Sequence, residues 1–182
     1  MNRNYIIITL LSGLAAVVSV ALADDDWRYS RSRGPDVAPV NNALYAEECG
    51  SCHMAYPPGL LPARSWERLM GNLDKHFGDN AELPQEDAAA ITGYLVGNAA
   101  DRSNYRRSMQ LAASIAPWDT PVRITRIPYF MHEHNEIPRQ LVAGNPQVKS
   151  LSQCQACHRS AEAGSFDEHD IDIPGYGRVE DD

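Results

Sequence analysis

The sequence predicts a mainly α-helical fold with extensive loops. Between residues 41 and 114, apolar residues recur at three- and four-residue intervals, which places them on one face of a helix. Prolines and glycines, 12 of each in the 182 residues, separate these segments and mark the loops. No β-rich alternating run precedes either of the two cysteine pairs, so the pattern favours helices over a sheet.

The first 23 residues have the pattern of a secretory signal peptide. Arg3 provides a short basic start, residues 5–20 form an apolar run, and Ala21-Leu22-Ala23 has the form of a signal-peptidase site. An uncleaved membrane anchor is the alternative, because the apolar run approaches the length of a short membrane span. The cleavage site and the three aspartates after it favour removal, so we expect the exported chain to begin at Asp24.

A lead-in and a first helix are expected next. Residues 24–40 are rich in charge, proline and glycine, and indicate a segment that is flexible or becomes ordered on contact. Asn41 or Asn42 can cap a helix that runs through Glu48 into the first cysteine pair. The prolines of residues 57–62 then predict a loop.

Two amphipathic helices should follow this loop. The first has Ser65 as its expected N-cap and ends near Gly78. Its apolar positions are Trp66, Leu69, Met70, Leu73 and Phe77. The second begins at Pro84, because proline suits the first turn of a helix. Its buried side is expected to carry Ile91, Tyr94 and Leu95.

The rest of the chain predicts shorter elements. A helix is expected from Asn104 to Ser114, and residues 115–121, with two prolines, suit a boundary between two modules. Short helices should cover residues 127–137, starting at Pro128, and begin again at Pro138. The tail after the last cysteine pair is rich in Asp, Gly and Pro and should be loop-like.

Two C-x-x-C-H motifs use all four cysteines of the chain. They are Cys49-Gly50-Ser51-Cys52-His53 and Cys154-Gln155-Ala156-Cys157-His158. This spacing is typical of covalent haem attachment, in which two thiols add to the two vinyl groups and the adjacent histidine becomes an axial iron ligand. The sequence therefore predicts two covalently bound haem c groups, attached through Cys49, Cys52, Cys154 and Cys157, with His53 and His158 as proximal ligands.

Three other interpretations of the cysteines explain less. Paired zinc knuckles normally lie about 15 to 20 residues apart, whereas about a hundred residues separate Cys52 from Cys154. A thioredoxin-like site needs a βαβ context, which neither motif has. Two structural disulfides would suit a secreted chain, yet they would not explain a histidine after each pair.

The place of the second motif limits the architecture. A class I cytochrome c module carries its haem motif near its start and needs several helices after it, but only a short tail follows His158. Tandem copies of that module are therefore not expected. After the signal peptide at 1–23 and the lead-in at 24–40, we expect a class I cytochrome c-like module at 41–116. A smaller irregular α-helical haem module should occupy residues 117–182.

The sixth ligand of each iron must come from the remaining histidines or methionines. His76, on the apolar side of a predicted helix, leads for the first iron. His132 and His134 lie two residues apart on a helix and point in different directions, so only one should face the second haem, and position does not choose between them. His169 lies among acidic residues and is expected to be exposed. The competing thioethers are Met70, Met109 and Met131.

Four strings extend the motifs: Glu48 to Pro62, Leu69-Met70 to His76-Phe77-Gly78, His134 to Pro138, and the Cys154 motif with Phe166-Asp167-Glu168. With them the chain resembles the periplasmic dihaem cytochromes c, called DHC. The resemblance implies bis-histidine ligation of both haems, with distal ligands at His76 and His134, and so favours His134 over His132. It also implies a periplasmic protein that passes electrons from a membrane b-type cytochrome to a small oxygen-binding c-type haem protein.

Histidine on both faces of each iron leaves no open position for peroxide, oxygen or another substrate. We therefore expect an electron-transfer protein with no catalytic residues and two low-spin, low-potential haems. The net charge of −8 argues against nucleic-acid binding and suggests a basic or locally complementary protein partner. The alternatives are a dihaem electron-transfer subunit of an oxidoreductase complex and, less favoured, a dihaem peroxidase, which needs a five-coordinate iron.

Overall fold

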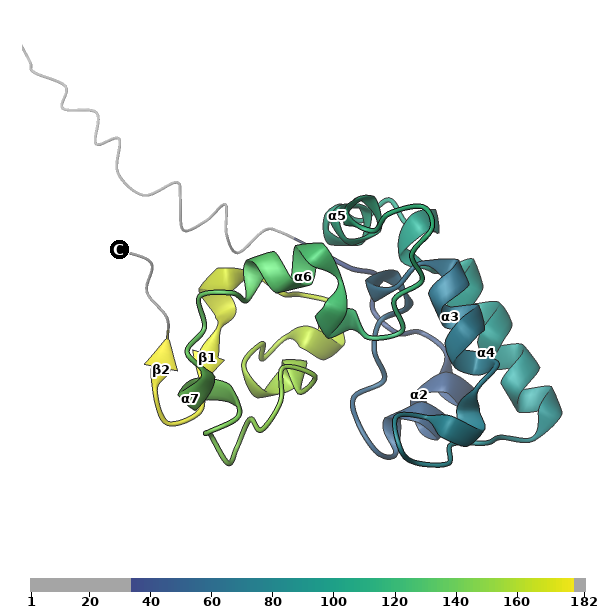
Figure 1. The fold of residues 1–182 in the computed structure, drawn as a ribbon, viewed down its shortest axis with the longest axis horizontal. Helices are drawn as coiled ribbons and strands as arrows, with labels where there is room; N and C mark the ends of the chain where they lie inside the picture. Colours follow the sequence, from purple (N-terminus) through teal and green to yellow (C-terminus); the bar gives the residue numbers. More distant parts are fainter. Residues whose placement is uncertain (1–33, 179–182) are drawn as a thin grey trace, which may run out of the picture. The chain divides into compact units, whose positions relative to one another are not determined.

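The computed structural model describes residues 34–178. These residues form a mainly helical fold with little strand, as predicted (Figure 1). The predicted signal peptide and most of the lead-in lie outside the described residues. From residue 34 to residue 178, none of the helices combines the length and the apolar character needed to cross a membrane.

Helix α2, Ala43–Gly50, leads directly into the first C-x-x-C-H motif. Asn42 is its N-cap, because the side-chain oxygen of this residue accepts a hydrogen bond from the backbone N–H of Tyr45 at 2.9 Å. The Tyr45 side chain is buried, and its hydroxyl donates to the carbonyl of Tyr56 at 2.8 Å. The helix is thus fixed at its start by the cap and against the segment after the motif by Tyr45.

The loop predicted at residues 57–62 is present, and it is buried. It contains a 3-10 turn at Pro58–Leu60, and the indole N–H of Trp66 donates to the Pro58 carbonyl at 2.7 Å. A side chain at Gly59 would meet Ser108 and Val37. Only glycine lets the loop approach helix α5, Arg106–Ser114, this closely.

The helix predicted from Ser65 to Gly78 is wrong in both bounds. Helix α3 spans Ala63–Met70, and Ser65 lies inside it, fully buried. The helix stops after Met70 because the next two residues, Gly71 and Asn72, are both weak helix formers. The Asn72 amide also donates to a backbone carbonyl one turn earlier at 2.8 Å, which competes with continuation of the helix.

His76 is therefore presented by a tight turn and not by a helix. A 3-10 turn at Leu73–Lys75 precedes it, and Phe77 and Gly78 follow with φ angles of 57° and 117°. A phenylalanine in the left-handed region is uncommon, whereas glycine adopts such angles at little cost. This turn sets the direction of the His76 side chain.

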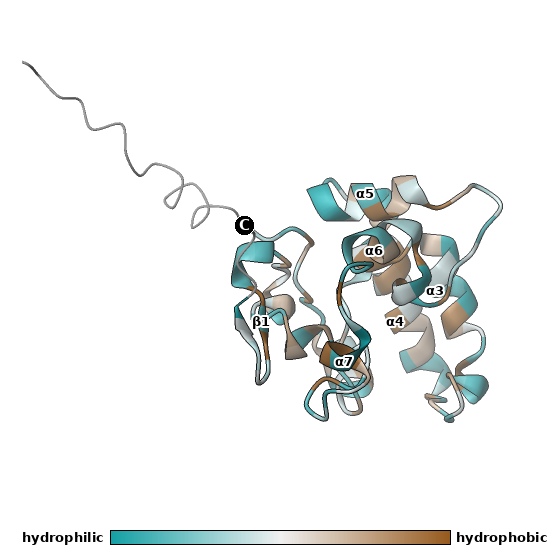
Figure 2. Cartoon of the chain, turned by 60° about the vertical axis from the view of Figure 1, so that its left-hand side comes forward, coloured by the Kyte–Doolittle hydropathy of each residue, from teal (hydrophilic) through white to brown (hydrophobic). Residues whose placement is uncertain are grey.

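Helices α4 and α5 agree closely with the prediction. Helix α4 spans Gln85–Gly97 after Pro84, with Ile91 and Leu95 buried, and it packs beside α3 (Figure 1). Helices α3 and α4 both carry hydrophobic and hydrophilic stretches in Figure 2, as partly exposed helices do. Helix α5 spans Arg106–Ser114 and begins slightly later than expected.

The C-terminal part contains shorter elements than predicted. Helix α6 covers Pro128–Glu133 and stops well before residue 137, and helix α7 covers Arg139–Val142. Strands β1, Asp172–Ile173, and β2, Gly177–Arg178, form an antiparallel pair in the tail that was predicted to be loop-like. Further 3-10 turns lie at Ala100–Arg102, Ile124–Arg126, Cys154–Ala156, Ala161–Ala163 and Glu168–Asp170.

One hydrophobic core includes residues from both predicted modules. Val37, Leu95, Ile127 and Phe166 all belong to it and are buried. At its edge, the backbone N–H groups of Asp36 and Val37 both donate to the carbonyl of Gly164, at 2.9 and 3.0 Å. The described end of the lead-in is therefore ordered by contact with the C-terminal part. The division at residues 115–121 stays a prediction.

Candidate haem sites

The histidine of the first motif faces the predicted distal histidine. The ring centroids of His53 and His76 lie 6.2 Å apart, and the ring planes differ by 20°. His53 comes from the turn after α2, and His76 comes from the turn after α3. The fold thus brings together two residues that the sequence placed in separate elements.

The second motif has the same arrangement with a different ring angle. His134, at the C-terminal end of α6, and His158 have ring centroids 6.2 Å apart and planes inclined by 65°. His158 lies one residue beyond Cys157, and its backbone N–H donates to the Cys154 carbonyl at 2.8 Å. This bond closes the motif into a tight turn.

Both gaps have the width that one metal ion bound on two sides requires. Imidazole nitrogens bound at about 2 Å to opposite faces of a metal ion leave ring centres roughly 6 Å apart. Rings stacked face to face lie closer, as Phe130 and His134 do at 3.9 Å. The residues present therefore fit a haem iron between the members of each pair.

Hydrogen bonds fix the tautomer of one ring in each pair. The Nδ1 atom of His53 lies 2.7 Å from the Met54 carbonyl, and Nδ1 of His134 lies 2.9 Å from the Phe130 carbonyl. Because a carbonyl only accepts, Nδ1 carries the proton in both rings and Nε2 keeps a free lone pair. This is the arrangement that a metal-binding imidazole needs.

Burial favours the neutral form of three of these four imidazoles. It lowers the pKa of His158 to about 4, and the neighbouring His134 adds to the effect. Burial also lowers the pKa of His134, against the opposing effect of its hydrogen bond to Phe130, and lowers the pKa of His76 with a contribution from His53. Neutral imidazole is the form that binds metals, so the surroundings favour it.

The cysteines of each motif precede its histidine, and none forms a disulfide. All four are free, and Cys49 and Cys154 are half-buried next to the core. Burial raises the pKa of each of these two thiols to about 11. Among residues 34–178, no group of three or more histidine, cysteine or acidic side chains gathers as a metal cluster would.

Comparison with protein families matches residues 45–166 to the family described as dihaem cytochrome c, DHC. The chain belongs to this family. This dihaem cytochrome c therefore carries two covalently bound haem c groups, as the two motifs predicted. Membership of the family points to electron transfer with redox partner proteins, and away from an enzyme.

Solved structures similar to this dihaem cytochrome c carry the same description. The diheme cytochrome c of Shewanella baltica OS155 shares 45% identity over 76% of this chain and 98% of its own, with a TM-score of 0.64. A diheme cytochrome c from Rhodobacter sphaeroides shares 41% identity over 71% of this chain and 100% of its own, also with a TM-score of 0.64. A search of curated proteins gives no match.

Aromatic rings contact all four histidines of this dihaem cytochrome c, and the ring of Phe77 lies 4.8 Å from that of His76. Tyr56 stacks on His53 with centroids 4.9 Å apart, and Phe130 stacks on His134 with planes 9° apart. Phe166 meets His158 edge-on at 5.4 Å. The sequence analysis missed these contacts. The spacing of Phe130 and His134, four residues apart on a predicted helix, was the available signal.

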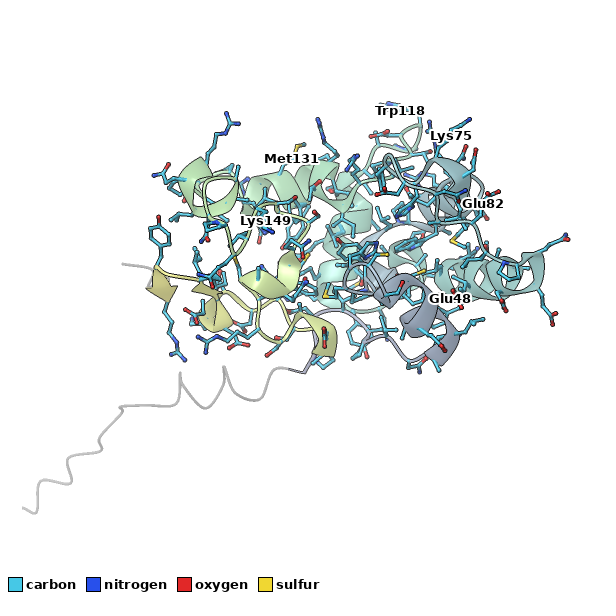
Figure 3. The ribbon with its side chains drawn as sticks, turned by 90° about the horizontal axis from the view of Figure 1, so that it is seen from below. Glu48, Lys75, Glu82, Trp118, Met131 and Lys149 are labelled. Atoms are coloured by element: carbon cyan, nitrogen blue, oxygen red, sulfur yellow. The ribbon has the colours of Figure 1, made fainter. Side chains whose placement is uncertain are left out.

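The other candidate ligands lie elsewhere. His132 is exposed, and Met109 and Met131 are 49% and 48% exposed. Figure 3 shows Met131 projecting at the edge of the molecule. Met70 is half-buried against the core. His169 is exposed and its Nδ1 lies 2.8 Å from an Asp167 carboxylate oxygen, as expected for a histidine among acids.

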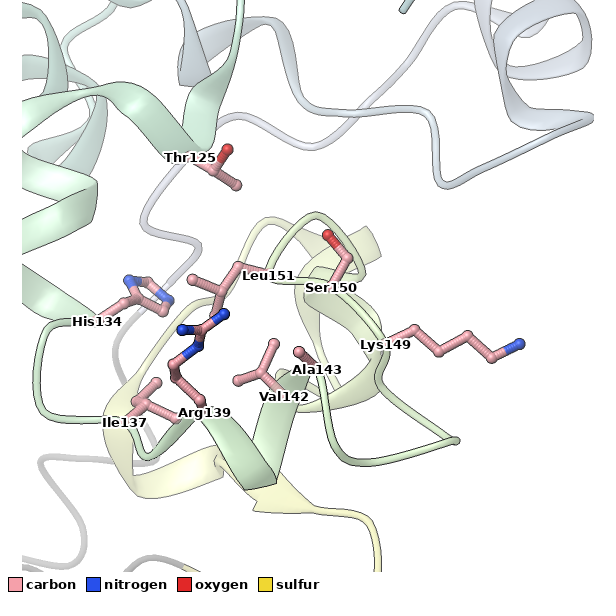
Figure 4. A pocket seen from close by; sticks show the side chains of 9 residues that line it. All are labelled: Thr125, His134, Ile137, Arg139, Val142, Ala143, Lys149, Ser150 and Leu151. Atoms are coloured by element: carbon pink, nitrogen blue, oxygen red, sulfur yellow. The ribbon is translucent and has the colours of Figure 1, made fainter. Parts of the chain in front are cut away.

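Each predicted distal histidine lines a cavity. The larger cavity, about 380 Å³, is formed around His134, Ile137, Arg139 and Leu151. In Figure 4 the His134 ring and the Arg139 guanidinium project into it, while Lys149 points away. The smaller cavity, about 150 Å³, is lined by residues that include His76 and Phe77, together with Arg68 and Lys75.

An ion-pair network anchors the surroundings of His158. A carboxylate oxygen of Asp36 accepts from the backbone N–H of Phe166 at 2.9 Å, and Arg107 donates to the Phe166 carbonyl at 3.1 Å. Arg107 also lies 3.8 Å from Asp36 and 3.6 Å from Glu133. The ring of Phe166 is thereby held against His158.

Proposed function

We propose that this dihaem cytochrome c is a periplasmic electron carrier with two low-spin, low-potential, bis-histidine haems. The observation that supports it most directly is the 6.2 Å separation of the rings in both pairs, His53 with His76 and His134 with His158. Histidine on both faces of an iron fills its axial positions, so peroxide and oxygen find no place to bind.

The proposed roles of the residues follow from this geometry. Cys49 and Cys52 attach the first haem, and Cys154 and Cys157 attach the second. His53 and His158 are the proximal ligands, and His76 and His134 are the distal ligands. Each haem supplies a reversible one-electron couple, and the chain supplies position and surroundings. Arg139 lines the cavity of His134 and would be available to pair with a haem carboxylate.

Low potentials follow from the same ligand set. A methionine thioether raises the potential of a haem because it favours the reduced iron. The candidate thioethers Met109 and Met131 are exposed, and neither lines a cavity with a candidate ligand. Histidine in all four axial positions therefore supports two potentials below those of histidine–methionine cytochromes.

Export and partners form a separate part of the proposal. The signal peptide at residues 1–23 would carry the chain to the periplasm, where cleavage would release it. We propose a membrane b-type cytochrome as the electron donor and a small oxygen-binding c-type haem protein as the acceptor, in line with the DHC resemblance. The net charge of −8 suits a basic surface on such a partner.

Spectra of histidine variants test the ligands. We expect the wild-type holoprotein to show two low-spin haems by electron paramagnetic resonance (EPR) and no methionine-to-iron charge-transfer band in its optical spectrum. His76→Ala and His134→Ala should each convert one haem to high-spin, because each removes one axial ligand. His132→Ala is the matched control on α6 and should leave both haems low-spin, since His132 is exposed.

Three results would contradict parts of the proposal. If His132→Ala produced a high-spin haem and His134→Ala did not, the assignment of the second distal ligand would be wrong. Rapid turnover of hydrogen peroxide by the wild-type protein would require an open iron and would favour a peroxidase. Stable copurification with a larger oxidoreductase would favour a subunit over a free carrier.

A further inference from the structure

Tyr56 contacts both haem sites. Its ring stacks on the imidazole of His53, with centroids 4.9 Å apart and planes inclined by 29°. Its hydroxyl donates a hydrogen bond of 2.7 Å to the backbone carbonyl of Ser152, which is 96 positions away in the sequence. One side chain thus touches the proximal histidine of the first site and the segment that enters the second motif.

The Ser152 carbonyl continues this connection to the second haem attachment. It lies 3.8 Å from the Sγ atom of Cys154, the first cysteine of the second motif. A continuous series of contacts therefore runs from the His53 ring through Tyr56 and the Ser152 carbonyl to the Cys154 sulfur. Each step is a ring stack, a hydrogen bond or a van der Waals contact.

The backbone of Tyr56 is also held in place. The Tyr56 carbonyl accepts a hydrogen bond of 2.8 Å from the hydroxyl of Tyr45, whose side chain is only 2% exposed. The next residue, Pro57, is buried and has a restricted φ angle. These contacts fix Tyr56 relative to the first site. The hydrogen bond from its hydroxyl therefore fixes the position of Ser152 relative to that site.

We infer that Tyr56 is a positioning residue that couples the two haem sites, by orienting His53 and by holding the Ser152–Cys154 segment against the first site. The inference rests on the proposed electron-transfer function. With both haems bound by the residues proposed above, electron exchange between them would oxidise one haem by one electron and reduce the other by one. No proton moves, because the Tyr56 hydroxyl donates the same hydrogen bond before and after.

Three variants of the purified holoprotein test this role. Tyr56→Phe keeps the ring on His53 and removes the hydrogen bond to Ser152. Tyr56→Leu removes both. Tyr94→Phe is the matched control, because the Tyr94 hydroxyl also bonds a backbone group far away in sequence, the N–H of Asn41, while its ring contacts Tyr45 and not a motif histidine. The rate of electron equilibration between the haems, the EPR spectrum, both midpoint potentials and denaturant stability should be measured for each.

We expect Tyr56→Phe to slow electron equilibration between the haems several-fold while the EPR signal of the first haem stays unchanged. Tyr56→Leu should slow it at least as much and also shift that signal, because the His53 ring loses its stacking partner. Tyr94→Phe should match the wild type in rate and spectrum. Equal rates in Tyr56→Phe, Tyr94→Phe and the wild type would overturn the inference, even if Tyr56→Phe were less stable.

The same experiment separates failure of this inference from failure of the proposed function. If the wild-type protein showed no low-spin pair, or if its haems did not exchange electrons, the proposed function itself would fail. If the wild type behaved as proposed and only the variants failed to differ, Tyr56 alone would lose its role. A Tyr56→Leu protein that does not fold leaves the Tyr56→Phe comparison intact.

Discussion

Individual ring planes distinguish the two candidate haem sites. The rings of His53 and His76 are nearly parallel, at 20°, whereas those of His134 and His158 are inclined by 65°. Axial ligands tune the electronic structure of a haem iron. Two imidazoles with parallel planes interact with the same iron d orbital and separate its energy from that of a second d orbital. Two imidazoles with crossed planes interact with both d orbitals and leave their energies close together.

This difference predicts two distinct EPR signals from the ferric protein. The first haem should give an ordinary rhombic low-spin signal, and the second should give a strongly anisotropic low-spin signal with a large maximum g value. Low-temperature EPR of the wild type and of His134→Ala assigns them, because the variant should lose only the anisotropic signal. Two identical rhombic signals would contradict the ring angles.

The phenylalanine beside His134 controls the orientation of this imidazole. Phe130 lies parallel to the His134 ring, and its own carbonyl accepts from His134 Nδ1. One residue thus controls both the plane and the tautomer of the imidazole. The sequence left His132 and His134 undecided because both lay on one predicted helix. The helix ends at Glu133, so His134 leaves the helical path and turns toward His158.

At the scale of elements, Asp36 joins three segments of the chain. It accepts from the backbone of Phe166 and pairs with Arg106 and Arg107 of α5, and its side chain is only 10% exposed. Arg107 is 15% exposed, so its charge depends on this carboxylate and on Glu133. Removing one member of a buried pair leaves the other charge unsatisfied.

Asp36→Ala should therefore lower the free energy of unfolding by about 3 kcal/mol. Lys75→Ala is the matched control, since Lys75 pairs with Asp74 at the surface, with 83% and 50% of the two side chains exposed. It should change the free energy by less than about 1 kcal/mol. Urea denaturation followed by circular dichroism measures both. Equal effects of the two substitutions would show that Asp36 does not have this role.

The elements that could be predicted are those with local signals. The cap at Asn42 and the proline at Pro84 located the starts of α2 and α4 to within a few residues, because the residues that start a helix lie next to it. The end of the helix around residue 70 was predicted wrongly. The apolar spacing continues past Gly71 and Asn72, whereas the helical backbone does not. The strand pair β1–β2 was missed because each strand has only two residues.

In the candidate haem sites, too, the residues with local sequence signals could be predicted and the long-range contacts could not. A C-x-x-C-H motif is contiguous, so both attachment sites and both motif histidines could be named from the sequence alone. Contacts such as that between Tyr56 and Ser152 join positions 96 residues apart, and no local pattern marks them. Such contacts between distant residues become visible only when the folded structure is known.

For the molecule as a whole, the two haems are expected to serve as part of the core. Helices α6 and α7 have six and four residues, far below the length at which an isolated helix is stable. Helix α7 contributes Arg139 and Val142 to the lining of the cavity of His134, and α6 leads directly into His134. We infer that the second haem stabilises this region, while α3 and α4 also support each other directly.

Removal of one haem at a time tests this difference. Cys154→Ala with Cys157→Ala should halve the haem content and expose the amides of α6 and α7 to rapid hydrogen exchange, while α4 stays protected. Cys49→Ala with Cys52→Ala is the reciprocal variant. Haem absorbance per protein and hydrogen exchange with mass spectrometry measure both effects. Unchanged protection of α6 and α7 without the second haem would contradict the expectation.

The paired histidines also have a consequence for the unfolded chain. About two dozen residues separate His53 from His76, and about as many separate His134 from His158. The entropy of closing a flexible loop depends mainly on its length. On the scale known for cross-links, each proposed iron bridge removes roughly 3 kcal/mol of chain entropy from the unfolded state. If both irons keep their ligands, the denatured protein is a chain with two rings of nearly equal size, joined by the segment between His76 and His134.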